Sequence, residues 1–281
     1  MNVETGIPLK RVHLRTPLLT ASGTFGFGDE FSAVTDYTPL GGIVTKSLSL
    51  KPRAGNPPPR IWETPIGGVL NSIGLANPGV EAFLTEKLEV LPWGVTEIFL
   101  SVVGETVEEF VEVVIRLETI SGISGYELNL SCPNVKKGGL ELGTDREMVK
   151  EIVAGCREIS DRFIAVKLTP HHPVIAPLAQ AAEEAGADAL TLTNTLVGMA
   201  IDIERRKPVL GSVTGGYSGP PLKPVALAKV WQAAQEVSIP IWASGGIITG
   251  ADGIEYLLAG ASALQLGSIL FVDPQAPARI L

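Results

Sequence analysis

Cys132 is the side chain of this sequence whose type and setting most directly suggest chemistry. It lies in Asn129-Leu-Ser-Cys-Pro-Asn134, directly after a short apolar run that is typical of a β-strand. A thiol in such a loop can be exposed, and its pKa can fall from about 8.5 toward neutrality. Cys132 could then act as a nucleophile or as a general base. Cys156, by contrast, falls in a helical pattern, and we expect it to be buried and inert.

The histidines offer little support for a nucleophilic cysteine, which usually needs a neighbouring base. His13 precedes the first predicted strand, whereas His171 and His172 follow the fifth. We therefore expect the histidine pair to be ordinary loop residues. On these local grounds, general-base chemistry at Cys132 is slightly favoured.

Polar or glycine residues end the predicted strands. Lys46 and Lys167 end the second and the fifth. Lysine is rarely buried without a charge partner, so two inward ammonium groups suit an anionic ligand, with Schiff-base formation as the competing role. The other strands end in Ala21-Ser22-Gly23, Ser101, Asn129, Asn194-Thr195, Gly245-Gly246 and Gly267-Ser268, and Ser47 follows Lys46. A buried polar group without a partner destabilises a protein by about 1–3 kcal/mol. A ligand site at the carboxyl ends of the strands therefore explains these polar residues best.

Two short pairs that contain glycine, Gly245-Gly246 and Gly267-Ser268, follow the last two predicted strands. Barrel enzymes often bind phosphate there, through backbone N–H groups and a helix N-terminus. Either pair alone could be a simple turn. Two pairs at these positions favour a phosphate site.

Short apolar runs alternate with amphipathic helical patterns through nearly the whole chain, which indicates βαβ units. Helices are predicted at 106–119, where Thr106 and Glu109 have capping-box spacing, and at 145–159, 174–185 and 223–237. The predicted strands are Leu18–Ser22, Gly42–Ser47, Glu97–Val103, Tyr126–Ser131, Phe163–Thr169, Ala189–Thr195, Pro240–Gly245 and Ala263–Gly267. This pattern predicts an α/β protein with one domain over residues 1–281, a (β/α)8 or TIM barrel, with an open doubly wound sheet as the alternative.

Three long connections follow strand ends, at Leu48–Pro78, Cys132–Thr144 and Leu196–Leu222. Loops of this length in a compact domain usually act as lids or binding loops. We therefore expect all three to border the ligand site.

The composition narrows the class of partner and compartment. The formal net charge of −8 argues against binding to a nucleic-acid backbone. Two cysteines cannot form a disulfide framework in a chain of 281 residues, which favours a reducing compartment. No uninterrupted apolar run is long enough for a membrane span, and the first ten residues lack the apolar core of a signal peptide. We expect a cytoplasmic protein with no membrane partner.

Taken together, these segments resemble the catalytic subunit of dihydroorotate dehydrogenases. The likeness runs from about Leu18 to Leu270 and is carried by nine segments in family order. They are Thr20-Ala-Ser-Gly-Thr-Phe-Gly26, Lys46-Ser47, Asn71-Ser-Ile-Gly-Leu75, Asn129-Leu-Ser-Cys-Pro-Asn134, Val166-Lys-Leu168, Thr193-Asn-Thr195, Gly215-Gly-Tyr-Ser-Gly219, Ser244-Gly-Gly246 and Leu266-Gly-Ser268. The resemblance implies a barrel that holds FMN and binds dihydroorotate or orotate.

The resemblance also assigns the site residue by residue. The FMN phosphate would lie at Gly245, Gly246, Gly267 and Ser268, and the rest of the flavin would be lined by Ser22, Lys46, Ser47, Ser101, Asn129, Lys167, Thr193 and Gly219. The substrate would be held by Lys46, Asn71, Ser72, Ile73, Gly74, Leu75, Asn129, Asn194 and Thr195. Ser101 and Ser268 depart from the family, which more usually has Asn and Thr there.

The resemblance implies a mechanism in which Cys132 is the catalytic base, in place of the serine of a second, membrane-associated class. Cys132 would remove the C5 proton of dihydroorotate while a hydride moves from C6 to flavin N5. Lys46 would offset the substrate's negative charge, and Lys167 would stabilise the reduced, anionic ring. The Cys132–Thr144 loop would close as a lid.

Two further segments, Lys51–Arg60 before Trp62-Glu-Thr64 and Ile201–Gly211, resemble the NAD-linked subgroup. The resemblance then implies a homodimeric core that passes electrons to a partner subunit with FAD and a [2Fe–2S] cluster, as a heterotetramer. A cluster needs about four cysteines, and this chain has two; it also lacks a Gly-x-Gly-x-x-Gly dinucleotide motif.

Three alternatives stay open: a fumarate-reducing homodimer, a flavin-free phosphate-binding barrel such as an isomerase or Schiff-base aldolase, and a non-catalytic scaffold. The family usually continues through a full final helix, so we expect the last helix to be either short or cut off at Leu281.

Overall fold

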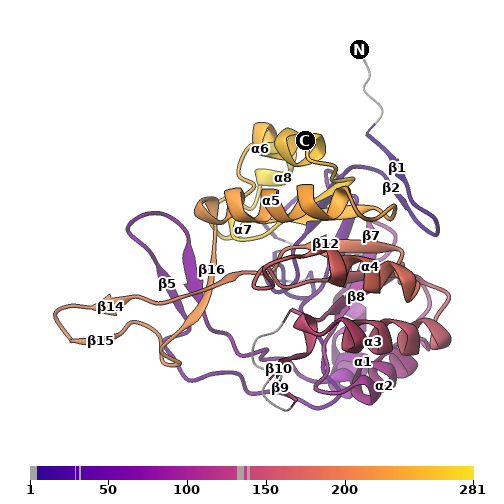
Figure 1. Cartoon of the computed structure of the whole chain (residues 1–281), viewed down its shortest axis with the longest axis horizontal. Coiled ribbons are helices and arrows are strands. Elements are labelled where there is room, and N and C mark those ends of the chain that lie inside the picture. Colours follow the sequence, from indigo (N-terminus) through magenta and orange to yellow (C-terminus); the bar gives the residue numbers. More distant parts are fainter. Residues whose placement is uncertain (1–4, 29, 32, 132–135, 138–139) are drawn as a thin grey trace.

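The computed structural model describes residues 5–28, 30–31, 33–131, 136–137 and 140–281, and its centre is a closed barrel of eight parallel strands (Figure 1). The strands are β3 (Leu18–Thr20), β4 (Gly42–Val44), β7 (Glu97–Val102), β8 (Gly125–Asn129), β11 (Phe163–Lys167), β12 (Ala189–Leu192), β17 (Ile241–Ser244) and β18 (Ala263–Leu266). Each pairs with the next along the chain, and β18 closes onto β3 in the register Leu264↔Leu18. The predicted (β/α)8 barrel is confirmed, and the open sheet was the wrong alternative.

Helices cover the outside of the barrel (Figure 1). They are α1 (Val80–Glu86), α2 (Val107–Leu117), α3 (Arg146–Ile159), α4 (Ala176–Glu184), α5 (Lys223–Ala234) and α6 (Gly250–Leu258), followed by the short α7 (Ile269–Val272) and α8 (Ala276–Ile280). The four helices predicted from the sequence are present.

One predicted helix cap forms only in part. At the start of α2, Thr106 Oγ1 accepts a hydrogen bond from Glu109 N, as predicted. The carboxylate of Glu109 accepts from Glu105 N, one residue before the position that a reciprocal capping box requires. A complete capping box starts α6 instead, between Thr249 and Asp252.

Side chains alternate across the barrel wall because successive residues of a strand face opposite sides. On β11, Ile164 and Val166 face outward into the core shared with the helices, whereas Phe163 and Ala165 face the interior. Phe163 stacks on Trp242 with ring centroids 5.3 Å apart, and Phe99 meets Trp242 edge-on at 4.9 Å. The hairpin β1 (Ile7–Pro8) and β2 (His13–Leu14) packs against this cluster through Leu14. The amino-terminal half of the barrel interior is therefore apolar.

Two of the predicted binding loops form a second sheet, which the sequence analysis did not predict. It is antiparallel, in the order β13 (Leu196–Gly198), β16 (Gly215–Ser218), β6 (Val69–Asn71) and β5 (Ile61–Glu63). The register Gly216↔Asn71 joins segments from the connections that follow β4 and β12. We call this four-stranded unit the covering sheet. A further hairpin, β14 (Ile201–Asp202) and β15 (Lys207–Pro208), projects from the body of the molecule (Figure 1).

The third predicted binding loop, Cys132–Thr144, is described only in part. Its described residues include the short pair β9 (Lys136–Lys137) and β10 (Leu140–Glu141) and the 3-10 turn Leu142–Thr144. Cys132 and residues 133–135, 138 and 139 of the predicted lid lie outside the described residues.

Asp188, just before β12, ties the amino-terminal end of the barrel together. Its buried carboxylate accepts hydrogen bonds from Arg157 Nη2 at 2.5 Å, Ile164 N at 3.0 Å and Arg11 Nε at 3.2 Å. We expect Asp188→Asn to lower the free energy of unfolding by about 3 kcal/mol, because breaking a buried ion pair leaves its charged partner uncompensated. Urea unfolding followed by circular dichroism measures this change.

The matched control is Glu184→Gln, which removes an exposed carboxylate that pairs with Lys150 at 2.5 Å and with Arg146 at 3.1 Å. Exposed pairs contribute about 0–1 kcal/mol, so this variant should unfold nearly like the parent. Equal losses in the two variants would contradict the structural role of Asp188.

Candidate active site

Two adjoining cavities open at the carboxyl end of the barrel. The larger has a volume of about 590 Å³ and is lined by residues of the barrel mouth and the covering sheet. The smaller, of about 70 Å³, lies at the ends of β12, β17 and β18. The two cavities share the wall residues Ser22, Lys167, Asn194, Thr195 and Ser218. They therefore form one continuous site with a wide part and a narrow part.

The structure brings together nearly all of the described residues that the sequence analysis placed in the site. The larger cavity is lined by Ser22, Lys46, Ser47, Asn71, Ser72, Ile73, Gly74, Leu75, Asn129, Lys167, Asn194 and Thr195. The smaller cavity is lined by Thr193, Gly219, Gly245, Gly246, Gly267 and Ser268. Ser101 lines neither cavity. It is fully buried behind the wall, where its hydroxyl bonds to Ser47 at 2.8 Å and to Ser22 at 3.0 Å.

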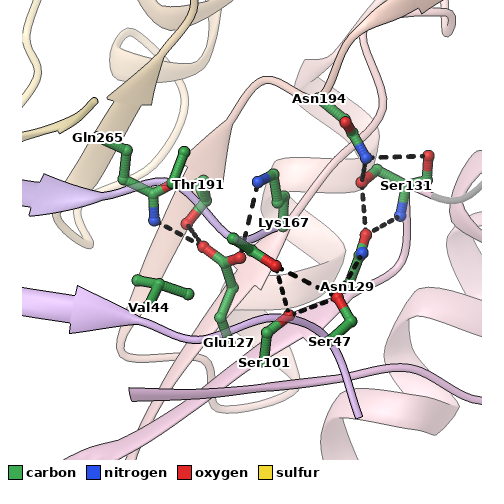
Figure 2. A network of polar contacts seen from close by, with 12 residues as sticks. Val44, Ser47, Ser101, Glu127, Asn129, Ser131, Lys167, Thr191, Asn194 and Gln265 are labelled. Carbon is green, nitrogen blue, oxygen red and sulfur yellow. Dashed lines mark hydrogen bonds and ion pairs between the residues drawn. The ribbon is translucent and has the colours of Figure 1, made fainter. Parts of the chain in front are cut away.

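A chain of hydrogen bonds fixes the polar side chains at the barrel mouth (Figure 2). Asn129 Nδ2 donates to Ser47 Oγ at 3.2 Å, and Asn129 Oδ1 accepts from Ser131 Oγ at 2.7 Å. Asn194 Nδ2 in turn donates to Ser131 Oγ at 2.6 Å. The two amides thus have defined orientations before any ligand binds, which lowers the entropy cost of binding. Ser131 links them, and the sequence analysis did not single it out.

Lys46 brings a positive charge to the larger cavity from the residues just after β4. The side chain is half-buried, and this burial lowers the pKa of its ammonium group below the usual range. The Glu30 carboxylate opposes the shift, and Arg60 adds to it. Lys46 therefore loses its proton, and with it its positive charge, at a lower pH than an exposed lysine does.

Lys167, the last residue of β11, faces both cavities and is only 4 % exposed. Its Nζ lies 3.7 Å from Oε1 of Glu127, which is fully buried inside the barrel (Figure 2). The sequence analysis missed Glu127, although one carboxylate inside an otherwise apolar strand was a signal that could have revealed it. The buried lysine predicted at this strand end thus has the charge partner that burial usually requires.

The glycine loops after β17 and β18 let main chain form the wall of the smaller cavity. Gly246 has φ +69°, and a Cβ there would lie 2.9 Å from Gly219 O, so a side chain does not fit. The helix N-terminus at this wall is that of α7, whose N-cap residue Ser268 lines the smaller cavity, whereas the N-terminus of α6 does not line it. The Asp252 carboxylate already accepts from Ile248 N at 3.0 Å and Thr249 N at 2.8 Å. An anion would therefore be bound by the glycine loops themselves.

Comparisons with known proteins identify the family. The family model described as dihydroorotate dehydrogenase matches residues 7–281. This chain belongs to the dihydroorotate dehydrogenase family. Among its relatives, the catalytic subunit of dihydroorotate dehydrogenase B (NAD(+)) from Trichlorobacter lovleyi is 50% identical over 280 residues, covering 100% of this chain and 90% of the relative. The subunit of the same name from Citrifermentans bemidjiense is 49% identical over 277 residues, covering 99% and 90%.

A solved structure is similar in fold to this member of the dihydroorotate dehydrogenase family. It is the crystal structure of DHODH in complex with ferulenol from Eimeria tenella, with a TM-score of 0.79 and 23% sequence identity. The match covers 99% of this chain and 82% of the other. The barrel architecture is thus shared with this solved structure. Within the described residues, no helix is long and apolar enough to cross a membrane.

Cys156 of this dihydroorotate dehydrogenase family member is fully buried in α3, as expected. Burial raises the pKa of its thiol to about 12. At pH 8 the thiol would therefore stay protonated and unreactive. We therefore expect iodoacetamide to label a Cys132→Ser variant only after denaturation, as measured by mass spectrometry. Rapid labelling of the folded variant would contradict this burial, and a Cys156→Ser variant serves as the control that reports on Cys132 alone.

His171 is a loop residue, as predicted. Its Nε2 accepts a hydrogen bond from Val197 N at 3.2 Å, which holds the first strand of the covering sheet. His172 Nδ1 likewise accepts from Val174 N at 3.3 Å. Both rings are thus engaged with nearby main chain.

Proposed function

We propose that this chain is the FMN-containing catalytic subunit of an NAD-linked dihydroorotate dehydrogenase, which oxidises (S)-dihydroorotate to orotate in pyrimidine biosynthesis. The observation that carries the proposal is the two-part site. A wide cavity that contains two lysines suits a small anionic ring, and it continues into a narrow, glycine-walled cavity that suits a phosphate. The family match and the names of the relatives agree with this reading.

The residues of the narrow cavity fit FMN. Gly245, Gly246, Gly267 and Ser268 would hold its phosphate, because the three glycines leave main chain at the cavity wall and Ser268 lines the same wall. The Thr193 hydroxyl, which is buried and has no hydrogen-bond partner among the described residues, would bond to the cofactor at the same wall. Ser22, Lys46, Ser47, Asn129, Lys167 and Gly219 would line the remainder. Ser101 lies behind the cavity wall and would orient the Ser22 and Ser47 hydroxyls. When bound, FMN supplies the acceptor for the substrate's hydride.

The wide cavity would bind dihydroorotate between the barrel mouth and the covering sheet. Lys46 would pair with the substrate's carboxylate, since charge-assisted hydrogen bonds are the strong ones. Asn71 to Leu75 would form one wall, with Asn129, Asn194 and Thr195 as hydrogen-bonding groups. Because Ser131 and Ser47 already orient the amides, these groups would select the ring's orientation.

Cys132 would remove the C5 proton, as the resemblance of Asn129-Leu-Ser-Cys-Pro-Asn134 to the family's segment implies. Asn129 and Ser131, the described residues just before it, belong to the network at the cavity wall. A base one residue after Ser131 and three residues after Asn129 would be near the substrate. The rest of the Cys132–Thr144 loop would then exclude water from that proton.

The electrons would pass to NAD+ through a partner subunit with FAD and a [2Fe–2S] cluster, around a homodimeric core of this chain. The two cysteines of the sequence cannot supply the roughly four ligands of such a cluster. The relatives that share about half of the residues are named as catalytic subunits of NAD(+) enzymes. A cytoplasmic location fits this arrangement.

A spectrum of the purified chain tests the proposal. Bound flavin should absorb at about 450 nm, and anaerobic dihydroorotate should bleach this band. A colourless protein that does not bind added FMN would refute the flavin reading in favour of a flavin-free barrel. Co-purification from the native source then distinguishes between the possible electron acceptors. FAD and iron–sulfur absorption in the complex supports the NAD-linked form, whereas direct fumarate reduction by the FMN protein alone would overturn it.

A further inference from the structure

We propose that Glu127 is the buried counter-ion of Lys167, and that it sets the net charge which the barrel presents to the flavin. This inference rests on the proposed function, because it concerns how one pair of residues acts on bound FMN. Glu127 lines neither cavity, so it would act through Lys167 as a positioning residue and not by contact with a ligand.

The carboxylate of Glu127 is held from three sides in the middle of the barrel (Figure 2). Oε2 accepts a hydrogen bond from Gln265 Nε2 at 2.6 Å and another from Thr191 Oγ1 at 2.9 Å. Oε1 lies 3.7 Å from Lys167 Nζ and has no hydrogen-bond partner among the described residues. The carboxylate is thus fixed by neutral donors on β12 and β18, with its other oxygen left for the lysine.

Small neighbours make room for this arrangement. The strand register places Ala165 directly beside Glu127, and Ala189 beside Ala165. All three are fully buried. Because two alanines take up little of the interior, the longer Glu127 side chain can reach across to Thr191 and Gln265. The sequence therefore provides a dedicated space for the carboxylate.

Stability alone does not account for a charge pair at this depth. The side chains of Lys167 and Glu127 are 6% and 0% exposed, and removing two such charges from water usually costs as much as their attraction returns. Apolar residues of similar volume at such positions are often neutral or stabilising. The pair connects the cavity wall to the barrel centre, since Lys167 lines both cavities. A role at the ligand site is the explanation that remains.

The consequence follows from the signs of the charges. Lys167 alone would favour the reduced, negatively charged flavin, and a fixed carboxylate beside it reduces that preference. The pair would therefore keep the reduced cofactor from becoming too stable to release its electrons. Removing the Glu127 charge while keeping its shape should make the flavin easier to reduce and harder to reoxidise.

The test compares the purified FMN-loaded chain with its Glu127→Gln variant. Sulfite adds to oxidised flavins and leaves their pyrimidine edge negatively charged, so its dissociation constant reports the local charge. We expect sulfite to bind about ten-fold more tightly to Glu127→Gln, on the scale of one unit charge removed in a buried site. The flavin midpoint potential should become more positive. An unchanged sulfite constant and potential in a folded, FMN-loaded variant would overturn the inference.

Two further variants separate charge from structure. Thr191→Val removes a hydrogen bond to the same carboxylate without removing its charge, and it should leave sulfite binding within about two-fold of the parent. The double variant Glu127→Gln, Gln265→Glu keeps one buried charge but moves it to β18. Its sulfite dissociation constant should lie between those of the parent and of Glu127→Gln. A ten-fold change in Thr191→Val would overturn the charge account.

If Glu127→Gln does not fold, the double variant decides. Sulfite binding tighter than in the parent supports the inference, and sulfite binding equal to that of the parent overturns it. Failure of the proposed function looks different, because the parent chain itself would then bind no FMN.

Discussion

Replacing Cys132 with alanine is expected to lower the rate of flavin reduction by dihydroorotate by about 10²–10⁴-fold, the usual effect of removing a general base. FMN binding should be unchanged, because the residues proposed to hold the cofactor belong to the barrel strands and the glycine loops. Anaerobic stopped-flow absorbance measures the reduction in a single turnover. Turnover close to that of the parent would remove Cys132 from the mechanism.

Two variants serve as controls for this experiment. Cys156→Ala changes the other cysteine, which is buried in α3 away from the cavities, and it should reduce flavin at the parental rate. Cys132→Ser keeps a group that can accept a proton, but a hydroxyl ionises far less readily than a thiol. Its residual rate should therefore rise with pH over a range in which the alanine variant stays flat.

Replacing Lys46 with methionine is expected to lower kcat/KM for dihydroorotate by about 100-fold, the value of one charge-assisted hydrogen bond in a site of this kind. The effect should appear mainly in KM, because Lys46 would bind the substrate's carboxylate before and during the reaction. Lys10→Met, which removes an exposed lysine, provides the control. A kcat/KM equal to that of the parent would exclude Lys46 from substrate binding.

The same lysine predicts a pH dependence with a definite sign. Burial lowers the pKa of Lys46, so its positive charge is present at low pH and is lost at a lower pH than in an exposed lysine. The affinity for an anionic substrate should therefore fall as the pH rises through that pKa. In Lys46→Arg the guanidinium stays charged, so the alkaline fall in kcat/KM should disappear. A fall at the same pH in both proteins would assign it to another group.

The barrel could be predicted from the sequence because its strands are covered on both faces and are therefore apolar over most of their length. Polar ends such as Lys46, Lys167 and Asn129 stand out against that background, and the structure places them around one cavity. The covering sheet could not be predicted in the same way. Its strands are three or four residues long, and one consists of Gly215-Gly-Tyr-Ser218, which has no alternation of polar and apolar residues.

Glu127 and Ser101 show a different limit. Both lie behind the cavity wall, and their importance depends on which strands are neighbours and in which register, for example Ser101↔Glu127 between β7 and β8. A single sequence places a residue on a strand but does not say what faces it across the barrel. The interior partners Thr191 and Gln265 are 64 and 138 residues away from Glu127 along the chain.

The wall shared by the two cavities makes their ligands thermodynamically linked. Ser22, Lys167, Asn194, Thr195 and Ser218 border both spaces, so a molecule in one restricts side chains that the other must also use. Any coupling free energy that arises is reciprocal: if the cofactor strengthens substrate binding, the substrate strengthens cofactor retention by the same factor. A substitution at any of these five positions should alter both equilibria together, so the site would evolve as one unit and not as two independent pockets.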